Sequence, residues 1–311
     1  MGFGADFHLK SPTTTEQFDF LAYAMKNYDV FHFYFRSMIR TGKVAQNFPS
    51  GADLIALRAA GKVVVMHYRG SEVRQKDAFD AMNRFSYSRE LPEMFNKWPK
   101  EEIDNFRNLV KATADHILCT DEELQSFVPE ASIVRRAIDV NLFQPVGPAI
   151  ENGRKLFIHA PTRRVVKGTS FVEAAMRELM SNNSAVDYRR IESLSHSDAT
   201  AAYRKATVAI DQLRIGWFGV FSLEAMALGK PTIAYVREDL RDAQTDKLPI
   251  IQANPETIHE VVAKVAEETD KGLALIGEES RAYVERHHDS AKIASQLIDL
   301  YESAQGAATG S

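Results

Sequence analysis

The clearest chemical potential in this sequence lies in residues 216–235, which read GWFGVFSLEAMALGKPTIAY. An aromatic turn bounded by glycines precedes a helical pattern that Gly229 ends, and an apolar run then predicts a buried strand. Free backbone N–H groups at the N-terminus of such a helix can bind an anion. Glu224 is the only acid in this stretch. We expect its carboxylate to accept hydrogen bonds from sugar hydroxyls rather than to bind the anion.

A second stretch, HAPTRRVVKGT at 159–169, follows an apolar run and opens a helical pattern. Its three cations, Arg163, Arg164 and Lys167, suit a diphosphate through both their charge and the dipole of the following helix. Ligands of open α/β sheets bind at the carboxyl ends of strands, where this loop is expected. The alternative is a solvated basic loop with no ligand.

Two other places carry polar side chains at predicted strand ends. His67 follows the run KVVVM and could hydrogen-bond a sugar hydroxyl or act as an acid. The alternative is a histidine that only terminates the strand, and His32 is expected to be a core or strand-end histidine. Asp211 and Gln212 directly follow the predicted strand 207–210 and are placed to reach the space beside the glycine turn.

The elements that must position these residues alternate along the chain, which predicts an open, mostly parallel α/β sheet in each half. Irregular sequence around 138–153 indicates a domain boundary. We predict a first Rossmann-like domain over 1–147, a second over 148–285, a crossing helix over 286–304 and a disordered tail over 305–311. The expected helices are 13–26, 53–60, 101–114, 121–127, 169–180, 198–205, 255–269 and 278–301. The expected strands are 28–35, 62–66, 116–119, 155–159, 186–191, 207–210 and 232–235.

Length and charge restrict the class of protein. The 311 residues suggest about two domains. The net charge of −4 argues against a general nucleic-acid or anionic-membrane binder. The single cysteine, Cys119, cannot form an intrachain disulfide, and no run is long enough to span a bilayer. We therefore expect a cytoplasmic protein without a transmembrane segment and without a nucleic-acid partner.

From Phe218 onward, the stretch 216–235 resembles the donor-site signature of retaining nucleotide-sugar glycosyltransferases of the GT-B architecture (group 1, or family 4-like). The resemblance implies that Lys167, with Arg163 or Arg164, contacts the donor diphosphate beside the turn at Gly219. Glu224 would hold the ribose, and His67 would line the reaction site. The residues that the resemblance implies as catalytic are His67, Lys167 and Glu224. Those that it implies as donor-binding are Arg163, Arg164, Lys167, Phe218, Gly219, Val220 and Glu224.

The same resemblance implies a metal-independent hexosyltransferase of carbohydrate biosynthesis, with two Rossmann-like domains facing across a cleft and a last helix that crosses back to the first domain. Its co-substrate would be a UDP- or GDP-sugar, with no other cofactor, and its acceptor is unknown. The chain departs from the family at Gly216, where the signature has its first glutamate, and at the N-terminus, where the usual first βα unit is not evident. Asp211 is the candidate to replace that glutamate in donor binding.

Two other functions fit these departures. One is a non-catalytic sugar-nucleotide-binding subunit that needs a partner, within a homo- or hetero-oligomer. The other is a sugar-nucleotide epimerase or hydrolase on the same fold, which would need carboxylates in the cleft for proton transfer.

Overall fold

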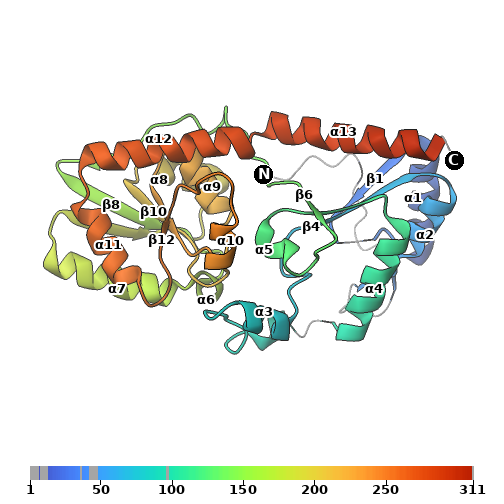
Figure 1. The fold of residues 1–311 in the computed structure, drawn as a ribbon, viewed down its shortest axis with the longest axis horizontal. Coiled ribbons are helices and arrows are strands. Elements are labelled where there is room, and N and C mark those ends of the chain that lie inside the picture. The colour runs from blue at the N-terminus through green and yellow to red at the C-terminus, as the bar shows by residue number, and fades with distance from the viewer. Residues whose placement is uncertain (1–6, 8–12, 36, 42–47, 96–97, 310–311) are drawn as a thin grey trace. The chain divides into compact units, whose positions relative to one another are not determined.

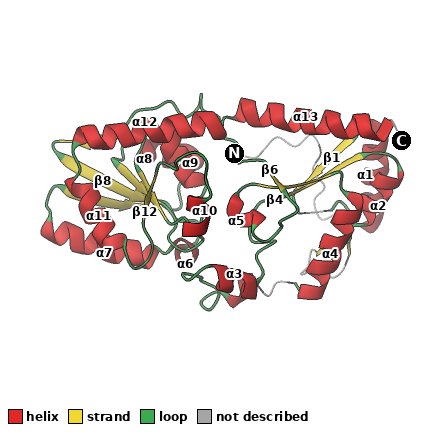
Figure 2. Ribbon diagram, in the orientation of Figure 1, coloured by secondary structure: helices red, strands yellow, loops and turns green. Residues whose placement is uncertain are grey.

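The computed structural model describes residues 7, 13–35, 37–41, 48–95 and 98–309. The chain forms two compact units (Figure 1). The first unit comprises residues 1–76, 92–134 and 294–311, and the second comprises 77–91 and 135–293. Each unit is built around a mainly parallel sheet (Figure 2).

The sheet of the first unit has the order β1-β4-β5-β6, and its neighbouring strands are parallel. Strand β4 is buried along its whole length because it lies between β1 and β5. Its continuous apolar run is typical of a central parallel strand. A separate antiparallel pair joins β2 to β3. The strands are β1 (Val30–Phe33), β2 (Arg40–Thr41), β3 (Phe48–Pro49), β4 (Val63–Tyr68), β5 (His116–Cys119) and β6 (Ser132–Ile133).

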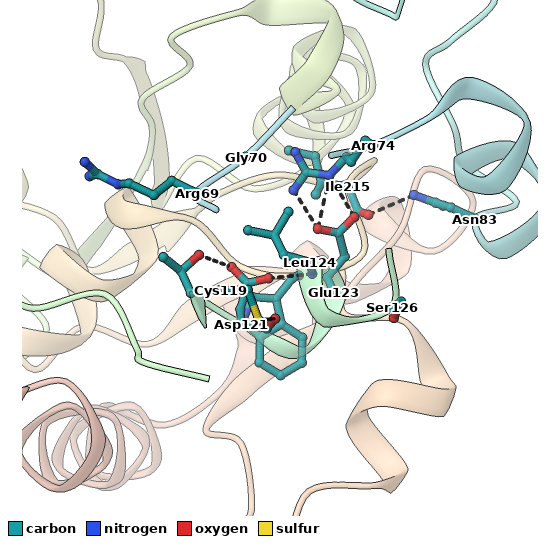
Figure 3. Close-up of polar contacts among 12 residues, drawn as sticks. Arg69, Gly70, Arg74, Asn83, Cys119, Asp121, Glu123, Leu124, Ser126 and Ile215 are labelled. Atoms are coloured by element: carbon teal, nitrogen blue, oxygen red, sulfur yellow. Dashed lines mark hydrogen bonds and ion pairs between the residues drawn. The ribbon is translucent and has the colours of Figure 1, made fainter. Parts of the chain in front are cut away.

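Local side chains cap and brace the helices of this unit. Thr13 and Glu16 form a reciprocal capping box at the start of the first helix. Asp121 accepts a hydrogen bond from the backbone N–H of Leu124, and Arg74 makes a buried ion pair with Glu123 (Figure 3). The helical elements up to residue 125 are α1 (Thr14–Asn27), α2 (Ala52–Ala59), α3 (Lys76–Met82), η1 (Pro92–Met94), α4 (Lys100–Thr113) and α5 (Glu122–Gln125).

The sheet of the second unit has the order β12-β11-β10-β8, and β9 pairs with the other side of β8. These pairings are parallel, whereas the short β7 forms an antiparallel pair with the start of β8. The strands are β7 (Ile150–Glu151), β8 (Arg154–His159), β9 (Val186–Arg190), β10 (Val208–Ile210), β11 (Thr232–Ala234) and β12 (Ile250–Gln252).

Alternate residues of these strands enter two separate apolar cores. Phe157 packs in one core with residues of α7 and α11, whereas its neighbour Ile158 packs in the other with residues of α8 and α9. Figure 1 shows α7 and α12 on opposite sides of this sheet. The helices are α6 (Arg164–Lys167), α7 (Thr169–Asn182), α8 (His196–Arg204), α9 (Val220–Ala227), α10 (Glu238–Asp242), α11 (Ile258–Glu267), α12 (Asp270–His287) and α13 (Ser290–Thr309).

The predicted single helix 278–301 is wrong, because two helices occupy this region. Helix α12 ends at His287, and α13 begins at Ser290. The break leaves backbone groups available to pair with residue 138. The backbone N–H of Ile138 donates to the carbonyl of His288 at 2.7 Å, and its carbonyl accepts from Ser290 at 3.0 Å. These two bonds connect residue 138 to the break between α12 and α13.

The division into units differs in two places from the predicted boundary at 147/148. Residues 135–147 belong to the second unit, and so does the segment 77–91, which carries most of α3. From Ala294 onward, the last helix belongs to the first unit. Among the described residues, no helix combines the length and the apolar content needed to cross a bilayer.

Candidate functional site

The predicted loops of the second unit leave its sheet at one place. After β8 the chain adds β9 on one side of that strand, and it then returns to add β10 on the other side. Ile210, the last residue of β10, lies opposite His159, the last residue of β8. The loops that follow these strands therefore start side by side at a topological switch point, where open α/β sheets bind their ligands.

His159 fixes the start of the first loop. Its Nδ1–H donates to the carbonyl of Ile210 at 2.7 Å, and its Nε2 accepts from the hydroxyl of Thr169 at 2.9 Å. Burial lowers the pKa of His159 to about 4, so the ring is neutral at neutral pH. This ring connects both strand ends to the start of α7, and it thereby holds the two ends of the loop that carries Lys167.

Lys167 and Asp211 form a buried ion pair between the two loops. The Nζ atom of Lys167 lies 2.6 Å from Oδ1 of Asp211 and 2.8 Å from Oε1 of Gln212. The side chain of Lys167 is 11% exposed and that of Asp211 is 0% exposed. A lysine ammonium has three N–H donors, so one remains after these two contacts.

Asp211 also organises the second loop. Its Oδ2 atom accepts from the backbone N–H of Gly219 at 2.8 Å and from the hydroxyl of Ser222 at 2.7 Å. Burial alone would raise the pKa of Asp211, but the Lys167 ammonium and the hydrogen bonds from Ser222 and Gly219 outweigh it, so this pKa lies below its ordinary value. Because both carboxylate oxygens are engaged within the protein, Asp211 acts in this conformation as a positioning residue.

Gly219 permits the close approach of these groups. A Cβ atom at this position would lie 2.9 Å from Oδ2 of Asp211 and 2.9 Å from Nζ of Lys167. Gly219 is also the N-cap of α9, and it provides no side-chain hydrogen bond to the first turn. The helix therefore begins beside the Lys167 ammonium without a side-chain cap, which is an arrangement that favours an anion.

The residues next to Gly219 differ in exposure. Phe218 is buried and stacks on Trp217 with their ring centroids 5.0 Å apart. Val220 is 44% exposed. The ring of Phe218 thus belongs to the core, and its contribution to a ligand site would come through its backbone.

Glu224 lies one turn into α9, where it is nearly buried. Its Oε1 atom lies 2.8 Å from Nε2 of His196, the first residue of α8. Burial raises the pKa of Glu224, although the hydrogen bond from His196 opposes this shift. The sequence analysis did not identify His196. The cap formed by Ser195 was the available signal, because it places His196 in the first turn of a helix.

The structure distinguishes the two arginines of the basic loop. Arg164 makes a bidentate pair with Glu192, at 2.9 and 2.7 Å, and its side chain is 59% exposed. The hydrogen bond from Arg164, with that from Arg190, lowers the pKa of Glu192 to about 2. Arg163 is the N-cap of α6 and has extended backbone angles. Arg164 thus pairs with Glu192 rather than with the carboxylate that Lys167 contacts.

Gly216 has a structural reason to stand where the signature has its first glutamate. Its φ angle is 96°, and a Cβ atom would lie 2.8 Å from Cγ of Arg237. From the segment 77–91, Asn83 donates to the carbonyls of Arg214 and Ile215 at 2.8 and 2.9 Å, and the contact with Ile215 is drawn in Figure 3. A glutamate at this position would need both a strained backbone and a displaced Arg237.

His67 belongs to the first unit, whereas the other predicted site residues belong to the second. It is buried near the end of β4, and its Nδ1 atom lies 3.2 Å from Nε2 of His32. The Nδ1 atom of His32 lies 2.5 Å from the phenol oxygen of Tyr301. His32 is thus a direct partner of His67, a contact that the sequence analysis did not predict.

No family model matches this sequence, and neither does any curated protein. Solved structures do match its fold. Sucrose-phosphate synthase from Thermosynechococcus elongatus has a TM-score of 0.66 at 15% identity, covering 94% of this chain and 77% of that one. HepE from Anabaena in complex with UDP has a TM-score of 0.60 at 14% identity, covering 93% and 82%. A glycosyltransferase from Rickettsia africae has a TM-score of 0.59 at 11% identity, covering 96% and 84%. The chain therefore has the predicted GT-B type of fold, with two Rossmann-like units.

Proposed function

We propose that this protein is a retaining glycosyltransferase that binds a nucleotide-diphospho sugar at the carboxyl ends of β8 and β10. The observation that carries the proposal is the buried Lys167–Asp211 pair beside the N-terminus of α9, whose N-cap residue, Gly219, provides no side-chain hydrogen bond to the first turn. A fixed ammonium and a helix N-terminus both stabilise negative charge at the same point. The likeness to the structure of HepE with UDP supports testing UDP-sugars before other donors.

In the proposed reaction, negative charge develops on the diphosphate as the glycosidic bond of the donor breaks. The remaining N–H of Lys167 and the first N–H groups of α9 would stabilise that charge without having to reorganise, because Asp211 already holds both in place. Glu224 would accept hydrogen bonds from the ribose with the oxygen that His196 leaves available. The reaction needs no metal ion in this scheme, so a chelator should leave it unchanged.

The binding half of the proposal can be tested with fragments of the donor. Isothermal titration would compare UDP, GDP, ADP, uridine and pyrophosphate. Lys167→Ala should weaken the nucleoside diphosphate by about 10- to 100-fold, because a hydrogen bond to a charged group is lost, and should leave the nucleoside unaffected. Glu224→Gln should weaken the nucleoside and the nucleotide, and should leave pyrophosphate unaffected.

Two control variants match these changes on the surface of the same unit. Lys264 pairs with Glu260 at 2.6 Å in an exposed part of α11, so Lys264→Ala removes a lysine ion pair elsewhere. Glu178 lies 2.7 Å from His259 on the protein surface, so Glu178→Gln changes a glutamate–histidine contact similar to that of Glu224 with His196. If the controls weaken binding as much as the site variants, or if no nucleotide binds, the proposed donor site is wrong.

Turnover is tested separately with the donor that binds. Release of the nucleoside diphosphate should require an acceptor, and the product should keep the anomeric configuration of the donor by NMR. Nucleotide binding without turnover would instead favour a non-catalytic subunit, which would need a partner chain. Release of the free sugar without any acceptor would favour a hydrolase.

A further inference from the structure

Three polar side chains of the first unit form a continuous row. His67 in β4 and His32 in the neighbouring β1 face each other, with Nδ1 of His67 lying 3.2 Å from Nε2 of His32. The Nδ1 atom of His32 lies 2.5 Å from the phenol oxygen of Tyr301 in α13. The backbone next to Tyr301 is itself held, because Nε2 of His116 in β5 lies 3.1 Å from the carbonyl of Leu300. The row therefore joins two strands and the last helix.

The middle member of the row is a neutral imidazole at neutral pH. Burial, with a contribution from the nearby Arg69 guanidinium, lowers the pKa of His32 to about 4. A neutral imidazole has one N–H donor and one bare nitrogen. The direction of one hydrogen bond of His32 therefore determines the direction of the other.

The phenol sets that direction. Burial raises the pKa of Tyr301, so the phenol keeps its proton at neutral pH. A phenol O–H is a strong donor and its oxygen a weak acceptor, whereas a bare imidazole nitrogen is a strong acceptor. The favoured arrangement has Tyr301 donating to Nδ1 of His32, which places the His32 proton on Nε2. That proton is then donated to Nδ1 of His67.

This arrangement determines the tautomer of His67. When Nδ1 of a neutral histidine accepts a hydrogen bond, its proton lies on Nε2, and this nitrogen can only donate. The ring of His67 is further restricted by the tilted ring of Tyr34, whose centroid lies 5.5 Å from that of His67 and 4.9 Å from that of His32. The row thus fixes both the plane and the tautomer of His67.

We propose that Tyr301 and His32 are positioning residues that hold His67 in its Nε2–H tautomer, so that His67 serves as a hydrogen-bond donor to a substrate hydroxyl and not as a base. This proposal rests on the proposed glycosyltransferase function only for the identity of the substrate. The tautomer itself is a property of the free protein.

The direct test is nitrogen NMR of the histidine rings. The chain has nine histidines, so the signals of His67 are assigned as those lost in His67→Gln. In the wild type we expect a pyridine-like signal for Nδ1 of His67 and a pyrrole-like signal for Nε2. In Tyr301→Phe the donor to His32 is lost, and both signals of His67 should shift toward the average of the two tautomers. Tyr23→Phe, an exposed tyrosine in α1, is the matched control and should change nothing.

A pyrrole-like Nδ1 in the wild type would overturn the proposal, because it would mean that the row runs in the opposite direction. So would an unchanged His67 spectrum in Tyr301→Phe. These NMR results do not depend on the identity of the donor. A wrong tautomer of His67 and a wrong proposed function can therefore be told apart.

Activity then tests the donor role of His67. Tyr301→Phe should lower kcat by about tenfold, the value of one ordinary hydrogen bond, and should leave the affinity for the nucleotide unchanged. His67→Gln retains an N–H donor and should keep more activity than His67→Ala. Equal loss in the two His67 variants would contradict the donor role, since a base would be removed by either change.

Discussion

The two units differ in what holds the carboxyl edge of each sheet. In the second unit, a buried ammonium and a fully buried carboxylate connect the loops after β8 and β10. In the first unit, two imidazoles and a phenol connect β1, β4 and α13 through hydrogen bonds. The first arrangement depends on a pair of formal charges, and the second depends on the absence of charge from His32.

This difference suits two kinds of ligand. A buried ammonium interacts strongly with an anion, because the electrostatic interaction is strong in a low-dielectric site, and the carboxylate beside it offsets part of this attraction. The pair also carries a large penalty in stability if one member is removed. A neutral row attracts an anion less, but it can fix the direction of donors toward uncharged hydroxyls. We therefore assign the diphosphate, within the proposed function, to the edge of the second unit.

The largest effect is expected from breaking the charged pair. Lys167→Met leaves the carboxylate of Asp211 buried without its ammonium, which should lower the free energy of unfolding by about 3–5 kcal/mol. Urea unfolding at pH 7 measures this loss. Adding Asp211→Asn removes the remaining charge, so the double variant should recover part of the stability.

Lys264→Ala is the control for this comparison, because its ion pair with Glu260 is exposed and should contribute little. A double variant as unstable as the sum of its single variants would show that the two side chains do not interact. The contrast between the two edges would then lose its electrostatic basis.

Much of the fold was predictable because its signals are local. Buried strands such as β4 contain a continuous apolar run, here Val63–Met66, and helices such as α4 have an apolar face at helical spacing. The break at 288–289 was not predictable, because it depends on pairing with residue 138, which is far away in the sequence. The assignment of 77–91 to the second unit has the same cause, since it depends on contacts with the loop around Arg214.

The candidate site was predictable to a smaller extent. The glycine turn, Lys167 and Glu224 could be found because the donor-site pattern keeps them at fixed spacing. The pattern does not say that Lys167 is paired with Asp211, nor that His196 contacts Glu224. Those partners come from other strands and helices, and only the order of strands in the sheet brings them together.

A smaller loss of stability is expected from placing a methyl group next to the Lys167–Asp211 pair. In Gly219→Ala the new methyl group would lie 2.9 Å from both the Asp211 carboxylate and the Lys167 ammonium, and these groups cannot move without losing other hydrogen bonds. The free energy of unfolding should fall by about 1–3 kcal/mol. Urea unfolding measures this change, and titration with the nucleotide should show weaker binding.

Gly272→Ala is a matched control for this change. Its methyl group would also meet a carboxylate, that of Glu268, but this side chain is exposed, so it can rotate away and accept hydrogen bonds from water in place of those from Thr269. Alanine is a better helix former than glycine, so this variant should be as stable as the wild type or more stable. Equal losses in the two variants would mean that the crowding at Gly219 has no special cost.

The smallest expected effect on the free energy of unfolding is the pH dependence that His32 contributes, in the row formed by His67, His32 and Tyr301. The folded pKa of His32 is about 4, below the ordinary value of 6.5. The unfolded chain therefore takes up a proton as the pH falls through 6.5, while the folded protein stays unprotonated at this site. The contribution of His32 to stability is complete above about pH 6.5 and is lost as the pH falls toward 4. Because the ring is partly exposed, we expect a loss of about 1–2 kcal/mol over this range.

His32→Gln isolates this contribution, because the amide keeps polar contacts but does not titrate. Between pH 6.5 and pH 4, its unfolding free energy should fall less steeply than that of the wild type, although buried His159 causes a similar loss in both proteins. His259→Gln, on the surface of α11, should leave the wild-type slope unchanged. The Lys167–Asp211 pair should not change the unfolding free energy between pH 6.5 and pH 4. Asp211 has a lowered pKa, so its contribution to stability is lost only at more acidic pH. Identical slopes for His32→Gln and the wild type would mean that the folded protein does not lower the pKa of His32, and the neutral row would then have to be abandoned.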